Sequence, residues 1–190
     1  METKKIAVLI GSLRKESYSR KIAKALMALA PETFQMEEVS IGDLAIYNQD
    51  LDDQVPPPAA WTEFRERMAD FDAFLFVTPE YNRSVPALMK NALDVGSRPF
   101  GKSIWNGKPG AVVSVSPGLI GGFGANHHLR QSLVFLNVPT LQQPEAYIGN
   151  AATLFDGDGT LNNEKTKEYL TKILDAFSAF VALNVPNKSK

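Results

Sequence analysis

The sequence contains no cysteine. Its absence excludes disulfide bonds, thiol catalysis, thiolate zinc sites and cysteine-bound iron–sulfur clusters, so any redox chemistry must be carried by a bound organic cofactor. An excess of charge of one sign is also missing, because 20 lysines and arginines stand against 21 aspartates and glutamates, for a net charge of -1. Without a basic face or a run of like charges, neither nucleic acid nor an anionic membrane is indicated as a partner.

Long hydrophobic runs are missing as well. No apolar stretch approaches the roughly eighteen residues of a membrane span. The first residues, METKK, are followed by only a short apolar run and lack the length and cleavage site of a signal peptide. We therefore expect a cytoplasmic protein. At 190 residues the chain suits one well-buried domain, residues 1–190, and is short for two.

Short β-branched or aromatic runs alternate along the chain with longer stretches of helical spacing, which is typical of βα units around a parallel sheet. We expect strands at 6–10, 36–41, 73–77, 111–115 and 140–148. We expect helices at 21–29, 61–71, 86–95 and 127–135, a last helix over 170–181, and Gly96 just beyond the end of the third helix.

Five βα units with short connections favour a three-layer α/β sandwich, in which helices cover both faces of a five-stranded parallel sheet. Right-handed crossovers leave few strand orders, of which the flavodoxin-like order 2-1-3-4-5 fits best. Ligands of such sheets bind beyond the carboxyl ends of strands 1 and 3. Three loops at that edge are therefore the candidates for chemistry.

The first loop, GSLRKESYS, covers residues 11–19 and follows strand 1. It matches neither the glycine-rich dinucleotide fingerprint nor a P-loop. It offers serine hydroxyls, the backbone amides of a helix start and the Arg14 guanidinium, which together suit a terminal phosphate monoester. The alternative is that Ser17 or Ser19 only caps the helix and that Arg14 is a solvated surface charge.

The second loop, TPEYNRSVP, covers residues 78–86 and follows strand 3. A turn rich in side chains, with proline and an aromatic ring, suits a flat heterocycle edged with carbonyls and ring nitrogens. As an alternative, Pro79 and Asn82 are ordinary turn formers and Tyr81 packs in the core.

The third loop, SPGLIGGFGAN, covers residues 116–126 after strand 4, and its four glycines permit close approach of backbone to a ligand or positive φ. They equally suit a flexible loop without a ligand. The three loops follow strands 1, 3 and 4, whose ends are neighbours in the expected order. A phosphate site beside a flat-ring site indicates a mononucleotide, and FMN fits best.

These loops resemble the hallmark loops of the NADPH-dependent FMN reductase family, in particular its flavodoxin-like chromate and quinone reductase branch. The resemblance extends over nearly the whole chain and is carried by GSLRKESYS, TPEYNRSVPALMKNALD and SPGLIGGFGANHHLRQSLVFL. It implies that the FMN phosphate is held by Ser12, Arg14, Ser17, Tyr18 and Ser19. It also implies that Pro79, Glu80, Tyr81 and Asn82 border the isoalloxazine, and that Ser116 contacts its far side. Many relatives carry an aromatic residue in place of Arg83.

Other candidates are weaker. The adjacent His127 and His128 point in different directions on a helix and have no further ligand at metal-binding spacing. The DGDG sequence at 156–159 lacks the glycine and glutamate positions of a calcium loop and is read as a surface turn. Phe100 and Trp105 either reach a neighbouring subunit or pack in the core.

We expect an FMN-dependent NAD(P)H oxidoreductase in which NADPH or NADH delivers hydride to the flavin and an oxidised acceptor replaces it, giving ping-pong kinetics. No side chain is expected to be catalytic. The resemblance implies quinones, free flavins, azo compounds or chromate as acceptors, and a homodimer or homotetramer as the assembly. The rival is a flavodoxin-like electron carrier without turnover of its own, although such carriers are usually strongly acidic. A phosphoacceptor receiver is set aside, because it needs acidic residues where this chain has Gly11-Ser12 and Thr78-Pro79.

Overall fold

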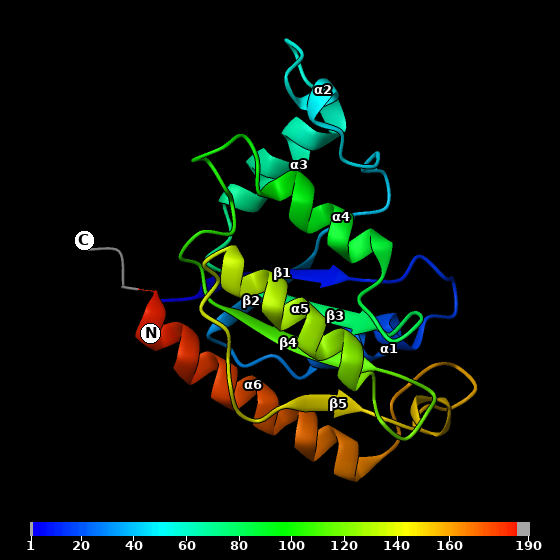
Figure 1. The fold of residues 1–190 in the computed structure, drawn as a ribbon. Helices are drawn as coiled ribbons and strands as arrows, with labels where there is room; N and C mark the ends of the chain where they lie inside the picture. Colours follow the sequence, from blue (N-terminus) through cyan, green and yellow to red (C-terminus); the bar gives the residue numbers. More distant parts are fainter. Residues whose placement is uncertain (1, 186–190) are drawn as a thin grey trace.

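The sheet is the centre of the molecule, and a computed structural model describes it together with its helices over residues 2–185. All of its strand pairs are parallel, and the order is β2-β1-β3-β4-β5 (Figure 1). The strands are β1 (Lys4–Ile10), β2 (Phe34–Glu38), β3 (Ala73–Pro79), β4 (Gly110–Val115) and β5 (Ala146–Ile148). The expected strand order is therefore confirmed.

The helices follow the strands as the alternating pattern predicts. They are α1 (Tyr18–Ala28), α2 (Gln49–Asp52), α3 (Ala59–Ala69), α4 (Ala87–Gly96), α5 (Phe123–Phe135), the short 3-10 helix η1 (Ala151–Thr153) and α6 (Glu164–Asn184). Within residues 2–185, none of these helices is long and apolar enough to cross a membrane.

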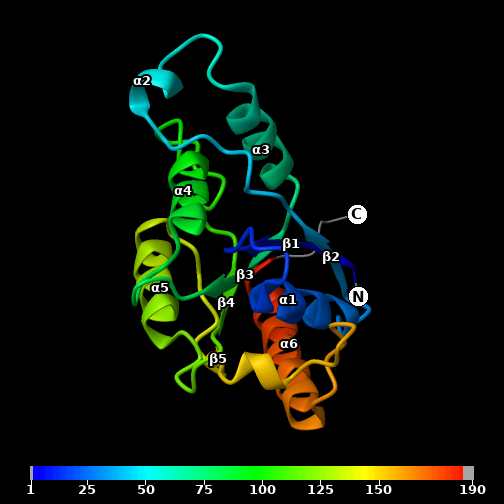
Figure 2. The same ribbon diagram turned by 90° about the vertical axis from the view of Figure 1, so that its right-hand side faces the viewer.

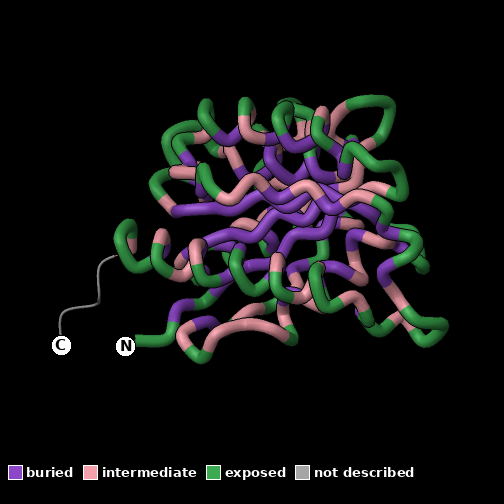
Figure 3. Tube along the Cα trace, turned by 90° about the horizontal axis from the view of Figure 1, so that it is seen from below, coloured by how far each residue is buried: buried purple, intermediate pink, exposed green. Residues whose placement is uncertain are grey.

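Two hydrophobic clusters lie on opposite faces of the sheet. One joins β1, β3 and β4 to α1 and α6, and the other joins the same strands to α3, α4 and α5. Figure 2 shows α1 and α6 on one side and α4 and α5 on the other, and Figure 3 shows the buried strands between the outer layers. Because β1, β3 and β4 are covered on both faces, they are near-continuous apolar runs rather than alternating ones.

Several element boundaries differ from the sequence-based expectation. The second strand ends at Glu38 instead of residue 41, because Val39 and Ile41 are buried against the α3 layer without belonging to β2. The last strand begins at Ala146 instead of residue 140. Thr140 makes only an isolated bridge to Gly110, and Pro144, which has no backbone N–H, interrupts the segment between.

The first two helices differ from the expected limits by three residues or fewer, and two further boundaries differ for a local reason. The third expected helix, α4, includes Gly96 as its last residue rather than ending before it. A Cβ at Gly96 would lie 2.6 Å from Nε1 of Trp105, so the glycine is required by close packing. The fourth expected helix, α5, begins at Phe123 and not at residue 127, since it starts within the glycine-rich loop.

The segment between β2 and α3 carries α2 and projects from the body at the top of Figure 1. The buried side chain of Asn91 on α4 anchors its base. The Asn91 amide nitrogen donates to the carbonyls of Leu44 and Ala45, each at 3.0 Å, and its oxygen accepts from the Tyr47 amide at 2.8 Å.

Candidate flavin site

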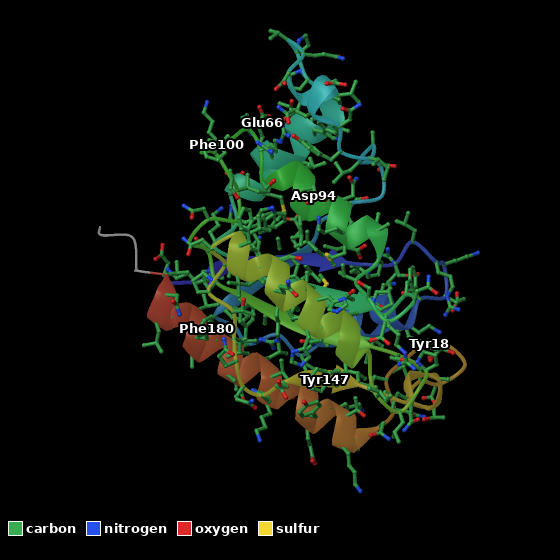
Figure 4. The ribbon with its side chains drawn as sticks, viewed as in Figure 1. Tyr18, Glu66, Asp94, Phe100, Tyr147 and Phe180 are labelled. Carbon is green, nitrogen blue, oxygen red and sulfur yellow. The ribbon has the colours of Figure 1, made fainter. Side chains whose placement is uncertain are left out.

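A pocket of about 260 Å³ lies beyond the carboxyl ends of β1, β3 and β4. It lies at the edge toward which the strand arrows of Figure 1 point, close to Tyr18, which Figure 4 labels. All residues that the sequence assigned to the site line it, with the exception of Asn82. The lining residues are Ser12, Arg14, Ser17, Tyr18, Ser19, Pro79, Glu80, Tyr81, Val115, Ser116 and Pro117. The three loops therefore meet as the strand order predicts.

The start of α1 forms one end of the pocket. Ser17 is the N-cap of α1, and its Oγ accepts the Arg20 amide at 3.3 Å. The amides of Tyr18 and Ser19 lie in the first turn, where backbone N–H groups have no partner within the helix. Ser12, Ser17 and Ser19 are buried. The capping interpretation of Ser17 is correct, and the cap still leaves amides and hydroxyls at the positive end of the helix dipole, which favours an anion.

Arg14 lies at the rim of this end. One of its guanidinium nitrogens donates to the backbone carbonyl of Glu16 at 2.6 Å, and the guanidinium carbon lies 5.3 Å from the centre of the Tyr18 ring. These two contacts hold the exposed side chain beside the pocket. Lys21 pairs with the Glu16 carboxylate at 3.1 Å, and this contact lowers the pKa of Glu16. The one carboxylate in the first loop therefore has its own cation, which leaves Arg14 available to an anionic ligand.

The turn after β3 forms the facing wall. Tyr81 and Ser84 exchange backbone hydrogen bonds of 3.1 and 3.0 Å. Asn82 and Arg83 between them both have positive φ, 51° and 64°, as in tight two-residue hairpin turns. Asn82 is therefore at the tip of the turn, beside the pocket. The Tyr81 hydroxyl lies 3.3 Å from the Ser12 Oγ, so the first two loops are joined across the pocket.

Glu80 differs from the expectation in one respect. Glu80 lines the pocket, but its carboxylate makes a hydrogen bond to the start of α5, where Oε2 accepts the Ala125 amide at 3.0 Å. Its Oε1 lies 3.3 Å from a guanidinium nitrogen of Arg83. Sequence reasoning missed this contact, because nothing in the local sequence of either loop links a residue after β3 to an amide 45 positions later.

The glycine-rich loop after β4 packs mainly against protein. Gly121 and Gly122 have positive φ, 65° and 77°. A Cβ at Gly121 would lie 2.7 Å from the backbone carbon of Tyr147, and one at Gly122 would lie 3.1 Å from the Ser114 Cβ. These two glycines permit the close approach of α5 to the sheet. Ser116 remains at the pocket, where its Oγ accepts the Gly118 amide at 3.0 Å. Val115 and Pro117 were missed, although both adjoin the predicted Ser116.

The remaining candidates have structural partners. His127 Nε2 lies 2.9 Å from the Tyr147 hydroxyl, whereas His128 Nδ1 lies 2.9 Å from the Ser84 Oγ, so the two rings face different neighbours. Over residues 2–185, no three histidine or acidic side chains are close enough to hold a metal ion. Asp158 accepts the Thr160 amide at 2.9 Å in an exposed turn.

The two aromatic residues before β4 have opposite environments. Trp105 is fully buried and donates to the Leu93 carbonyl at 3.0 Å, so core packing is the correct alternative for it. Phe100 is 91% exposed. It lies at the far end of the molecule from Tyr18 (Figure 4).

An open parallel sheet in this order, with a helix start that favours an anion and a turn wall beyond the carboxyl ends of β1 and β3, defines a flavodoxin-like mononucleotide-binding protein. A family model described as NADPH-dependent FMN reductase matches residues 4–153. A quinone reductase of Pseudomonas putida is 60% identical over 179 residues, 94% of this chain and 95% of that protein. A 2-hydroxy-1,4-benzoquinone reductase of a Burkholderia species is 45% identical and covers 93% of this chain and 96% of its own length.

Solved structures agree. FerB, a flavoenzyme NAD(P)H:(acceptor) oxidoreductase from Paracoccus denitrificans, superimposes with a TM-score of 0.90 at 38% identity, over 97% of this chain and 100% of that chain. The chain therefore belongs to the NADPH-dependent FMN reductase family and is an oxidoreductase. The family resemblance read from the three loops is confirmed.

Proposed function

We propose that this protein is an FMN-dependent NAD(P)H:quinone oxidoreductase. The observation that carries the proposal is the pocket in which the start of α1 meets the turn after β3. Its donor set fits FMN, because hydroxyls, free amides and a guanidinium at one end suit a phosphate with several oxygens. The names of the relatives, quinone reductase and 2-hydroxy-1,4-benzoquinone reductase, support quinones as acceptors.

Each wall of the pocket has a separate task. The phosphate is held by the first loop and the first turn of α1, through Ser12, Arg14, Ser17, Tyr18 and Ser19. Pro79, Glu80, Tyr81 and Asn82 border the ring system from the β3 side, and Ser116 lies on its far side. FMN bound there would supply the redox chemistry, in which a hydride equivalent from NAD(P)H reaches the quinone through the flavin and one proton comes from water. The protein binds and orients, and no side chain is assigned a proton transfer.

NAD(P)H and the acceptor share one face of the pocket, which gives ping-pong kinetics. Free flavins, azo compounds and chromate are further candidate acceptors. The alternative is an electron carrier without turnover of its own. The net charge of the chain, -1, is unlike the strongly acidic composition that is usual for such carriers.

Anaerobic stopped-flow mixing of the FMN-loaded protein with NADPH separates these functions. An enzyme loses its visible flavin absorption within its turnover time and regains it when a benzoquinone is added. A carrier stays yellow until a partner reductase is present, and that result would refute the proposal.

We further propose a homodimer or homotetramer that assembles through α4 and α5. A groove of about 670 Å³ runs between these helices, and two large apolar side chains of α5 are strongly exposed, Val134 at 77% and Phe135 at 90%. Exposed apolar surface of this kind marks interaction sites. Analytical ultracentrifugation should show dimers or tetramers, and Phe135→Glu should shift them toward monomer.

We propose that the enzyme is located in the cytoplasm, where NAD(P)H is available to it.

A further inference from the structure

The turn after β3 is attached to α5 by the carboxylate of Glu80. This side chain is only 12% exposed, and both of its oxygens are engaged. Oε2 accepts the Ala125 amide at 3.0 Å, in the first turn of α5, and Oε1 lies 3.3 Å from the guanidinium of Arg83. A carboxylate at a helix start satisfies an amide that has no partner in its own helix and interacts favourably with the helix dipole.

Two further contacts hold the same turn on α5. Gly124 packs so closely that a Cβ there would lie 2.7 Å from the Arg83 carbonyl oxygen and 3.0 Å from the Glu80 Oε2. Four residues along α5, His128 Nδ1 lies 2.9 Å from the Ser84 Oγ. The turn is therefore held at its first residue, its tip and its last residue.

The opposite side of this turn is a wall of the pocket. Pro79, Glu80 and Tyr81 line the pocket, and the Tyr81 hydroxyl lies 3.3 Å from the Ser12 Oγ on the other wall. A shift of the turn away from α5 would therefore change the distance between the two walls. The negative charge of Glu80, in contrast, is directed to an amide and a guanidinium outside the pocket lining.

We propose that Glu80 is a positioning residue whose hydrogen bond to α5, rather than its charge, sets the affinity of the pocket for FMN. This inference rests on the proposed function, since it assumes that FMN is the ligand. It differs from a direct electrostatic role, in which any loss of the Glu80 charge would change the affinity for FMN or the reduction potential of the bound flavin.

Glu80→Gln and Glu80→Ala separate the hydrogen bond from the charge. Glutamine keeps an oxygen that can accept the Ala125 amide, whereas alanine removes the acceptor. We expect the Kd for FMN, measured by fluorescence titration of the flavin-free protein, to stay within about twofold for Gln and to rise about tenfold for Ala. The reduction potential of bound FMN should be unchanged in the Gln variant. Glu66→Gln, on the exposed surface of α3 far from Tyr18 (Figure 4), is the matched control.

Amide hydrogen exchange at Ala125 tests the contact without any flavin. In the flavin-free protein, exchange at this amide should be faster in Glu80→Ala than in the wild type and unchanged in Glu80→Gln. Equal protection in all three proteins would overturn the inference whatever the FMN measurements give.

Gly124→Ala tests the contact from the α5 side, and it serves even where Glu80→Ala fails to fold. The added methyl group would separate the turn from α5, so the Kd for FMN should again rise about tenfold. The double variant should bind about as weakly as the weaker single variant, because both changes break one contact. Gly157→Ala is the control, since a Cβ there meets nothing within 4 Å.

The failures are distinguishable. A wild-type protein that binds no FMN would refute the proposed function. A wild type that binds FMN while Glu80→Ala binds it equally well would overturn the positioning role alone. A loss of affinity or a changed potential in Glu80→Gln would show that the charge acts directly, which also overturns it.

Discussion

Replacing Arg14 by alanine removes the guanidinium at the phosphate end of the proposed flavin site. The side chain is prepared for an anion, because its contacts to the Glu16 carbonyl and the Tyr18 ring hold it at the rim of the pocket. The neighbouring Glu16 carboxylate is paired with Lys21 at 3.1 Å, and the contacts of the Arg14 guanidinium are to a backbone carbonyl and an aromatic ring. We therefore expect Arg14→Ala to weaken FMN binding while leaving the fold intact.

The size of the effect follows from the kind of contact. A hydrogen bond to a charged group contributes about 1.5 to 3 kcal/mol. Because Arg14 is exposed, salt screens part of this, and the lower half of the range is expected. At about 1.4 kcal/mol for each tenfold change, the Kd for FMN should rise about tenfold to fortyfold.

Fluorescence titration of the flavin-free protein measures this Kd. Arg14→Lys should lie between wild type and Arg14→Ala, because lysine keeps the charge but loses the planar fork. Lys15→Ala, an exposed cation next in the chain, is the control and should change the Kd little. Higher salt should weaken binding more in the wild type than in Arg14→Ala. Equal affinities for FMN in Arg14→Ala and wild type would refute the placement of the phosphate.

Three further predictions concern other parts of the molecule. Arg83, whose side chain is 79% exposed on the turn beside the pocket, is placed to attract the 2'-phosphate of NADPH, so Arg83→Gln should raise the KM for NADPH about two- to fivefold and leave that for NADH unchanged. Equal changes in the KM values for NADPH and NADH would rule out this role of Arg83. Burial and the nearby Glu145 carboxylate raise the pKa of Tyr147 from 10.0 to about 12. The folded protein therefore holds this proton more tightly than the unfolded chain, and the free energy of unfolding should fall as pH rises from about 10 to about 12. Urea titrations across that range should show a flatter curve for Tyr147→Phe, and identical curves would contradict the pKa shift. Gly96→Ala should destabilise the protein by about 1 to 3 kcal/mol in the same assay, since the new Cβ would lie 2.6 Å from the Trp105 indole. An unchanged urea midpoint would show that the Trp105 indole moves aside without a loss of stability, which would contradict the prediction.

The strand order could be predicted because buried parallel strands are short apolar runs and because few topologies satisfy right-handed crossovers. The residues at which strands end were harder to predict from the sequence. Val39 and Ile41 have the apolar character of strand residues, yet they are buried by the α3 layer without belonging to β2. The apolar character of a residue indicates that it is buried. Whether it belongs to a strand depends on hydrogen bonds to a neighbouring strand, which the local sequence does not show.

The candidate site was predictable for a related reason. Parallel strands bring their carboxyl ends to one edge, so unusual loops after β1, β3 and β4 had to meet. What the sequence could not give was the direction of individual side chains. The Glu80 carboxylate turns to α5, and Gly121 serves packing against Tyr147, because both depend on contacts distant in the chain.

The central claim is that the start of α1 and the turn after β3 hold FMN between them. A crystal structure of the protein with FMN tests it most directly. We predict the phosphate within hydrogen-bonding distance of Ser12, Arg14 and the first amides of α1, with the ring system against Tyr81. A phosphate bound elsewhere, or a different molecule in this pocket, would contradict the account.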